Sequence, residues 1–494
     1  MTGLLVFVLF MLALGLVQFA TPHMPGNDGF YHIKMAYLMR TEGLKPAFPW
    51  LPLTILNPRE FYNHHFLFHV FLIPFTLGDL VLGAKWATVV LASLAFVAVW
   101  RLLDAQRIPY PVLWALGLLA VSEAFIARMS IARAQSLSLG LLALGLHWLL
   151  TGRTKRLFVL GFVYVWSYNA FPLLLGVAGA YTAARWLVER RLDLRPLVYS
   201  GLGIVAGSIL NPYFPYNLVF VYQHIVPKLF DATTVSVGSE WYPYTTAQLL
   251  NNAPLALVLF LSAVLPIGLS RRRMDVRTAT TFLLATLFGW MLFRSRRFIE
   301  YFPAFALIFA AFAWAPVLSA TQARARKARQ AVQPPWWRAI WRHAVAVALV
   351  AVLLPCDWMT LQRSRATMQT AKPSELYAGA AGWLAANTDA GDRVFQTDWD
   401  DFTRLFFHNT PNTYLVGLDP TYMQSYDADL YALWVSVTRG EVEAPSQIIA
   451  GHFGARYVMS DLLHEAFMRQ AERDPRMVEV YRDDDAVVYE VTEG

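Results

Sequence analysis

Two carboxylates could do chemistry in this otherwise very apolar chain. Asp28 lies in the segment GNDGFYHIKMAYLMR, where Gly26 and Gly29 allow the chain to turn sharply. Glu240 lies in TTVSVGSEWYPY, far along the sequence. A carboxylate can orient a substrate or take its proton, so both are candidate catalytic residues. The alternative for Asp28 is that the Asn-Asp pair only caps the helix that follows.

A group of arginines could bind phosphate, because guanidinium groups stay charged and donate hydrogen bonds in a bidentate fork. We expect them to bind the phosphate of an anionic lipid headgroup; they are Arg128, Arg133, Arg296 and Arg297. Two alternatives stay open. The run at 294–297 is partly neutralised by Glu300, or Arg128 and Arg133 only anchor the chain to lipid headgroups.

The remaining sequence offers little other chemistry. The histidines at 32, 64, 65 and 69 could bind metal, but their irregular spacing favours hydrogen bonding or an interfacial role. The sequence has no HExxH, P-loop, GxSxG or usable GxGxxG motif, so a hydrolase or a nucleotide-driven pump has no support. The single Cys356 excludes a disulfide framework and a cysteine zinc site.

The composition identifies the environment of these residues. Of 494 residues, 56% are hydrophobic and 15% are charged, whereas soluble domains carry about 25% charged residues. This deficit excludes a disordered chain and an ordinary cytosolic enzyme. It predicts a polytopic α-helical membrane protein.

The charge is distributed unevenly along the chain. Residues 1–358 carry a net charge of +17 and residues 359–494 a net charge of −10, with 11 basic and 21 acidic residues in the second part. We therefore predict a transmembrane domain at 1–358 and a soluble α/β domain at 359–494. The net charge of +7 then reflects basic loops and does not indicate a nucleic-acid partner.

Long apolar runs predict about eleven transmembrane helices. The run 66–77 contains His69 and Pro74, and we interpret it as re-entrant or interfacial; with short or re-entrant segments the number rises to 13. The eleven predicted spans are 2–21, 79–103, 110–126, 136–151, 157–172, 173–188, 197–211, 251–270, 277–293, 298–318 and 343–358.

Basic clusters in alternate loops predict the orientation, because cytoplasmic loops are rich in Lys and Arg. They lie near 101–107, 153–156, 185–195, 271–277 and 324–338. This pattern places the N-terminus in the cytoplasm and the C-terminal domain on the outer, periplasmic side of a bacterial inner membrane. Asp28, Glu240 and the arginines of 127–135 and 294–297 then share the outer face.

The C-terminal part alternates between helix and strand. The segment 374–387 predicts a helix, and short apolar runs predict strands at 393–396, 413–418, 456–459, 478–481 and 486–491.

These residues resemble a known family. The chain is similar to the catalytic subunit of oligosaccharyltransferase, especially its bacterial single-subunit form, within the GT-C class of glycosyltransferases. The resemblance runs nearly end to end and rests on Asn27-Asp28-Gly29-Phe30, the segment 74–79, Trp166-Ser167-Tyr168, Val235 to Glu240, Arg297-Phe298, and Thr397 to Phe402. It implies that Asp28 serves the catalytic centre, that Arg297 contacts donor phosphate, and that Glu240 is the carboxylate of an external loop.

The family has a pair of acidic residues in its second external loop that completes a divalent metal site. Counted from Arg128, those positions fall on Gln135 and Leu137. Asp28 and Glu240 could still hold Mg²⁺ or Mn²⁺ weakly. The alternative is that Arg133 supplies the missing positive charge and that no metal takes part.

The resemblance implies an inverting transfer of a glycan from a polyprenyl-(di)phosphate donor to a protein or glycan acceptor at the outer face. The residues expected to contact the acceptor are Tyr31, His32, Gln135, Trp399 and Asp400. One alternative is a monosaccharide transferase that uses a polyprenyl-phosphate sugar on lipid A, a polysaccharide or a protein hydroxyl. Another is a non-catalytic membrane protein that binds lipid-linked glycans.

Overall fold

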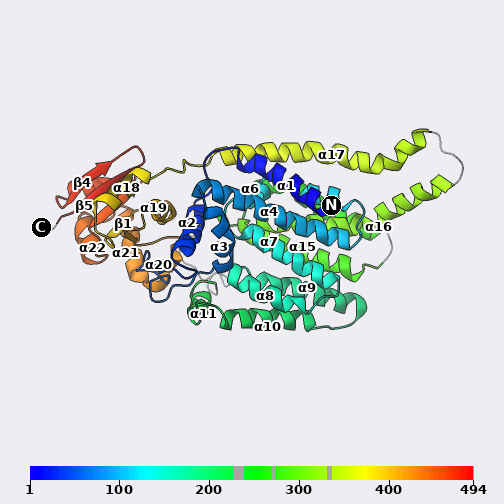
Figure 1. The fold of residues 1–494 in the computed structure, drawn as a ribbon, viewed down its shortest axis with the longest axis horizontal. Helices are drawn as coiled ribbons and strands as arrows, with labels where there is room; N and C mark the ends of the chain where they lie inside the picture. The colour runs from blue at the N-terminus through cyan, green and yellow to red at the C-terminus, as the bar shows by residue number, and fades with distance from the viewer. Residues whose placement is uncertain (226–237, 270–272, 331–335, 493–494) are drawn as a thin grey trace. The chain divides into compact units, whose positions relative to one another are not determined.

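A computed structural model describes residues 1–225, 238–269, 273–330 and 336–492 (Figure 1). The chain divides into two compact units. The first comprises Met1–Pro22, Lys85–Gly207 and Gly238–Ala371, and the second comprises His23–Ala84, Ser208–Val237 and Lys372–Gly494. The boundary predicted after residue 358 lies inside a helix that continues to Gln369.

The first unit is helical throughout the part that the structure describes. Two helices, α4 and α10, extend a few residues beyond its boundaries. Its helices are α1 (Thr2–Gln18), α4 (Leu80–Ala105), α5 (Pro111–Leu116), η2 (Gly117–Leu119), α6 (Glu123–Met129), α7 (Gln135–Leu150), α8 (Arg156–Ser167), α9 (Pro172–Glu189), α10 (Arg195–Ile209), η4 (Ser239–Trp241), α13 (Thr246–Asn252), α14 (Pro254–Leu269), α15 (Val276–Arg294), η5 (Arg296–Glu300), α16 (Phe302–Gln330) and α17 (Trp336–Gln369).

The predicted apolar runs are largely helical, although 110–126 and 251–270 each contain a break, and the predicted number of eleven spans is not confirmed. Among the described residues, four helices are long and apolar enough to cross a membrane: Leu80–Ala105, Val276–Arg294, Phe302–Ala320 and Ala346–Gln369. The number rises to six if each of two bent helix pairs forms one span. The difference has a physical reason. The helix α8, for example, has 12 residues and is about 18 Å long, which is short of the roughly 30 Å of a bilayer core.

The two bent pairs meet at their breaks. The helices Pro111–Leu119 and Glu123–Met129 are bent by 86°, as are Thr246–Asn252 and Pro254–Gly268. At the breaks, the Ala256 amide donates to the Val121 carbonyl at 3.2 Å, and the Ser122 hydroxyl donates to the Asn252 carbonyl. Backbone groups released by a helix break in an apolar environment need such partners. The junction therefore fixes the start of α6.

The second unit combines short helices with one sheet. Its helices are α2 (Asp28–Thr41), α3 (Phe66–Leu72), η1 (Ile73–Thr76), α11 (Tyr216–Phe220), η3 (Val221–Ile225), α18 (Ala378–Asn387), η6 (Trp399–Asp401), α19 (Phe402–His408), α20 (Thr421–Tyr426), α21 (Ala428–Thr438), α22 (Pro445–Gly451) and α23 (Glu465–Arg473). Its strands are β1 (Arg393–Gln396), β2 (Thr413–Tyr414), β3 (Tyr457–Asp461), β4 (Met477–Arg482) and β5 (Ala486–Val491).

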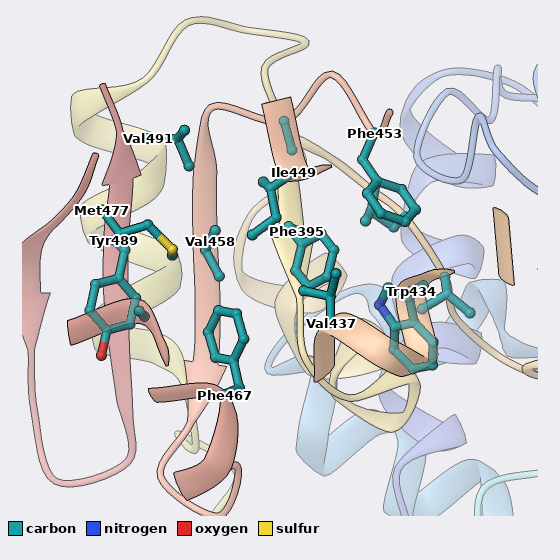
Figure 2. Packing of buried hydrophobic residues seen from close by; sticks show 14 of the residues in the cluster. Phe395, Trp434, Val437, Ile449, Phe453, Val458, Phe467, Met477, Tyr489 and Val491 are labelled. Carbon is teal, nitrogen blue, oxygen red and sulfur yellow. The ribbon is translucent and has the colours of Figure 1, made fainter. Parts of the chain in front are cut away.

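The five strands form one mixed sheet in the order β2-β1-β3-β5-β4. The strands β1, β2 and β3 are parallel, whereas β5 runs antiparallel to both β3 and β4. Successive side chains of a strand point to opposite faces, and Phe395 and Val458 are paired on one face. On that face they pack with Val437, Ile449 and Phe467 of the covering helices (Figure 2). The predicted α/β architecture of the C-terminal part is thus confirmed.

The helix α2 begins directly after a tight turn at Gly26, whose φ of 77° favours glycine. Gly29 lies inside the helix instead of in the turn. The sequence indicated a helix after Asp28, and most of its side chains are buried. The reason is that α2 packs against both α3 and α19.

Candidate functional site

In the first unit, two hydrogen bonds to backbone carbonyls hold the segment that carries Glu240 against the start of η5. The Ser295 hydroxyl donates to the Glu240 carbonyl at 2.9 Å, and the Arg296 amide donates to the Tyr242 carbonyl at 3.0 Å. Residues 235–237 of the family-like segment lie outside the described residues. The two predicted functional segments are therefore side by side, although they are more than fifty residues apart.

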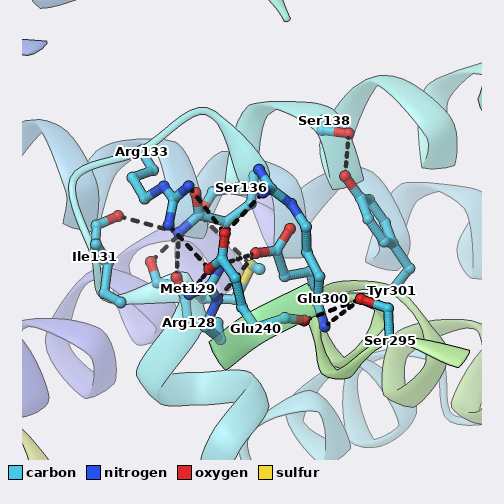
Figure 3. Close-up of polar contacts among 12 residues, drawn as sticks. Arg128, Met129, Ile131, Arg133, Ser136, Ser138, Glu240, Ser295, Glu300 and Tyr301 are labelled. Atoms are coloured by element: carbon cyan, nitrogen blue, oxygen red, sulfur yellow. Dashed lines mark hydrogen bonds and ion pairs between the residues drawn. The ribbon is translucent and has the colours of Figure 1, made fainter. Parts of the chain in front are cut away.

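Three arginines converge on the Glu240 carboxylate. Arg297 Nη1 lies 2.7 Å from Glu240 Oε1, whereas Arg128 Nη1 and Arg133 Nη1 lie 2.9 and 3.3 Å from Oε2. The four side chains are 18–22% exposed. We name this group the arginine cluster; Figure 3 shows Arg128, Arg133 and Glu240 within it.

The charges in the arginine cluster control the ionisation of Glu240. Burial by itself raises the pKa of this carboxyl, but the positive charges of Arg297, Arg133 and Arg128 outweigh it and hold the pKa well below the usual range. Glu240 is therefore ionised at any physiological pH. A carboxylate in this state binds guanidinium groups and does not act as a general acid.

A second carboxylate, Glu300, balances part of the charge. Its side chain is 1% exposed, and its Oε1 accepts hydrogen bonds from both Nε and Nη2 of Arg128. The sequence suggested that Glu300 neutralises the nearby run at 294–297. Its hydrogen-bonded partner is instead Arg128, because the C-terminal end of α6 packs against η5.

Gln135 supports the loop that carries the arginines. Its amide nitrogen donates to the backbone carbonyls of Arg128 and Ile131, and the side chain is buried. The Ser136 hydroxyl donates to the Met129 carbonyl at 3.3 Å (Figure 3). These bonds close the turn between α6 and α7 and hold Arg128 and Arg133 on one side of it.

Arg297 has the most extensive surroundings of the cluster. Its Nη2 donates to the Tyr168 hydroxyl at 2.7 Å, and its guanidinium lies 4.8 Å from the centre of the Trp241 ring, a cation–π distance. The neighbouring Arg296 differs, because its Nε donates to the Pro243 carbonyl at 3.3 Å and its guanidinium lies over Tyr244. The structure thus brings Arg128, Arg133 and Arg297 together on Glu240, whereas Arg296 contacts Pro243 and Tyr244.

The second unit contains Asp28, the first residue of α2. The preceding Asn27 occupies the N-cap position without a side-chain capping bond. Its side-chain nitrogen Nδ2 instead donates to Asp400 Oδ2 at 2.5 Å, and its side-chain oxygen Oδ1 accepts from Arg404 Nε at 3.0 Å. Asn27 therefore does not cap the helix with its side chain. Its side chain instead connects the start of α2, where Asp28 lies, to Asp400.

Asp28 and Asp400 influence each other electrostatically. Burial raises the pKa of Asp400 to about 6, and the nearby negative charges of Asp28 and Asp398 add to the shift. Asp400 therefore keeps its proton to a higher pH than a solvent-exposed aspartate does. We name Asp28 and Asp400 the carboxylate pair.

Arg404 is a residue that the sequence did not single out. It is 2% exposed, its Nη1 donates to the Pro373 carbonyl at 2.6 Å, and its guanidinium lies 4.4 Å from the centre of the Phe30 ring. Together with its bond to Asn27, these contacts join the start of α2 to α19. The signal in the sequence was a single arginine in the apolar helix after the Asp-Trp-Asp-Asp run.

The other predicted acceptor residues lie in different surroundings. Tyr31 and His32 are 2% and 3% exposed, and His32 Nδ1 lies 2.8 Å from Nε2 of His69. Trp399 packs against the core of the sheet. A role in acceptor binding stays a prediction for these residues and for Gln135.

The fit of the site to a divalent metal can be tested on the carboxylates. Both oxygens of Glu240 are taken by guanidinium groups. Among the described residues, no group of three or more His, Cys, Asp or Glu side chains is arranged to hold a metal ion. The residues present do not fit the metal site that the resemblance implies.

Comparison with known proteins identifies the fold. No protein-family model matches the sequence, and no curated protein matches it. Among solved structures, the apo oligosaccharyltransferase of Archaeoglobus fulgidus has a TM-score of 0.67 at 14% identity, over 99% of this chain and 74% of that chain. The archaeal oligosaccharyltransferase AglB from the same organism, in complex with an inhibitory peptide and a dolichol-phosphate, has a TM-score of 0.65 at 14% identity and the same coverage.

A further solved structure, ArnT from Cupriavidus metallidurans bound to undecaprenyl phosphate, has a TM-score of 0.54 at 17% identity, over 99% of this chain and 98% of that chain. At these identities the similarity shows the fold and leaves the substrate open. The chain has the GT-C fold of polytopic membrane glycosyltransferases.

Proposed function

We propose that the protein is a membrane glycosyltransferase that uses a polyprenyl-phosphate or polyprenyl-diphosphate sugar as its donor. The observation that carries the proposal is the arginine cluster. Its guanidinium groups outnumber the carboxylates Glu240 and Glu300 that they contact. The excess positive charge is partly buried beside apolar helices, which favours a phosphate group attached to a lipid.

The reaction assigned to this cluster is the departure of the donor phosphate. As the acceptor atom bonds to the anomeric carbon, the bond from that carbon to the phosphate oxygen breaks, and its electrons stay on the phosphate. Fixed guanidinium groups stabilise the negative charge that develops there. We assign this role to Arg297, Arg128 and Arg133.

The acceptor side of the reaction is assigned to Asp28. An inverting transfer releases one proton from the acceptor, and a carboxylate can orient the acceptor and receive that proton. The hydrogen bonds of Asn27 to Asp400 and Arg404 fix the backbone from which Asp28 extends. We further propose that transfer occurs at the outer face of a bacterial inner membrane, which rests on the distribution of basic loops.

A second candidate is a monosaccharide transferase that acts on lipid A, a polysaccharide or a protein hydroxyl. It is supported by the fold similarity to ArnT bound to undecaprenyl phosphate, over 99% of this chain and 98% of that chain. The two candidates share the phosphate chemistry. They differ in the mass that is transferred, which is a single sugar in one case and an oligosaccharide in the other.

The test is mass spectrometry of the lipids that co-purify with the full-length protein and with Arg297→Ala. We expect a polyprenyl phosphate or diphosphate glycan that is lost from the variant. Arg294→Ala is the control, because Arg294 is exposed at the end of α15. If only ordinary phospholipids are found, even after lipid-linked sugars are added, the donor assignment is wrong.

A further inference from the structure

The arginine cluster differs in one respect from a site built for a divalent cation. A cation such as Mg²⁺ or Mn²⁺ needs several oxygen ligands, usually one or two carboxylates completed by substrate phosphate and waters. Here Glu240 Oε1 is bonded to Arg297, and Oε2 is bonded to Arg128 and Arg133. An incoming cation would have to displace guanidinium groups of the same sign of charge.

The second carboxylate of the cluster offers no alternative ligand set. Glu300 is 1% exposed, and its Oε1 accepts from Arg128. The acidic positions expected from the family are occupied by Gln135 and Leu137. Gln135 uses its amide to bind the backbone of the α6–α7 turn, so it is part of the support of the loop.

We propose that the Arg133 guanidinium stands where other members of this fold class use a divalent cation, so that the enzyme binds its donor phosphate and turns over without metal. The inference rests on the proposed function and concerns which group supplies the positive charge in the arginine cluster. Arg133 extends from the turn between α6 and α7, and its Nη1 lies 3.3 Å from the carboxylate of Glu240.

The charge of the cluster explains why an arginine in place of a divalent cation has a functional consequence. A metal site that contains several carboxylates is negative when the metal is absent, and it then repels phosphate. This cluster is positive by its own residues, because arginine stays charged at any physiological pH. It is therefore ready to bind phosphate when no divalent cation is present.

The experiment uses the full-length protein in nanodiscs, with undecaprenyl phosphate as the probe. Its binding is measured in EDTA and again with added Mn²⁺, for the wild type and for Arg133→Ala, Arg133→Lys and Arg294→Ala. We expect equal wild-type affinity in both conditions and a loss of roughly tenfold or more in Arg133→Ala that Mn²⁺ does not restore. Arg133→Lys should keep part of the affinity, and Arg294→Ala should behave like the wild type.

Direct measurement of Mn²⁺ provides a second readout that does not depend on the lipid. Electron paramagnetic resonance measures free Mn²⁺ and thereby the amount that the protein binds. We expect the wild type and Glu240→Gln to bind the same amount, so that no bound ion depends on Glu240. Such a bound ion, or loss of undecaprenyl phosphate binding in EDTA, overturns the inference.

The binding experiment gives one result if only the inference is wrong and another if the proposed function is wrong. If undecaprenyl phosphate binds only with Mn²⁺, the site is a phosphate site that needs metal, and only the inference is wrong. If it binds in neither condition, the donor assignment fails, and the inference about metal-free phosphate binding fails with it.

Discussion

The arginine cluster and the carboxylate pair differ in the charges that surround their carboxylates. In the cluster, three guanidinium groups surround Glu240, so the charges attract and the carboxylate stays ionised. In the pair, burial raises the pKa of Asp400 to about 6, and the negative charge of Asp28 adds to the shift. The first arrangement is suited to stabilising an anion, and the second is suited to orienting a group and holding a proton. Three variants test this contrast.

The largest effect is expected for Asp28→Asn. If the carboxylate orients and deprotonates the acceptor, its loss should lower turnover by roughly 10³-fold while binding of undecaprenyl phosphate stays normal. Turnover is measured as glycosylated product by mass spectrometry. Glu42→Gln, at the exposed C-terminal end of the same helix, is the control. Full activity of Asp28→Asn would remove Asp28 from the mechanism.

An intermediate effect is expected for Arg404→Met, because the substitution leaves Asn27 Oδ1 and the Pro373 carbonyl without their donor. The cost is about 2–3 kcal/mol of stability, measured as a lower melting temperature. Since Asn27 then loses its position, kcat should also fall more than KM rises.

Arg393→Met is the matched control for this variant. Arg393 also donates to a backbone carbonyl in the same unit, that of Phe453, whereas Asn27 Oδ1 accepts from Arg404. It should lower the melting temperature and leave kcat unchanged. Equal kcat losses in both variants would mean that Arg404 acts only through stability.

The smallest effect is expected for Asp400→Asn, and it depends on pH. The raised pKa means that the folded protein keeps a proton that the unfolded chain releases between pH 3.8 and about 6. Stability therefore falls as the pH rises through this window. Asparagine removes the penalty but keeps an oxygen that accepts from Asn27. The variant should therefore be more stable above pH 6 by less than about 3 kcal/mol, the equivalent of the whole shift, and no more stable at pH 4.

Thermal melting at several pH values measures this effect. Asp484→Asn, in the exposed turn between β4 and β5, should leave the pH profile of the wild type unchanged. An Asp400→Asn profile that runs parallel to the wild type at all pH values would show that the pKa of Asp400 is not raised in the folded protein.

The sequence predicted local structure better than the partners of its charged residues. The strand at 393–396 was predicted with its observed bounds, and the strand at 486–491 likewise. Both contain a short apolar run that follows turn residues, Gly391-Asp392 in one case and Asp483 to Asp485 in the other. The apolar runs located the helices. They did not reveal the breaks near Val121 and Ala253, since hydropathy is continuous across a helix that bends.

Long-range contacts could not be read from the sequence. Glu240 and Arg297 were each selected, but the convergence of Arg128, Arg133 and Arg297 on one carboxylate depends on how distant helices pack. For the same reason the hydrogen bonds of Glu300 to Arg128 could not be predicted, although its negative charge also acts on Arg297, as the sequence suggested. Arg404 was missed, because a buried arginine has no local pattern that separates it from an exposed one.

The junction of the two bent helix pairs has a consequence for the entropy of ligand binding. Arg128 extends from α6, a helix of seven residues, and so short a helix is marginal by itself. The hydrogen bonds of Val121 and Ser122 across the junction order its first turn in advance. A phosphate that binds Arg128 therefore does not have to order this helix, and that conformational cost is absent from the affinity.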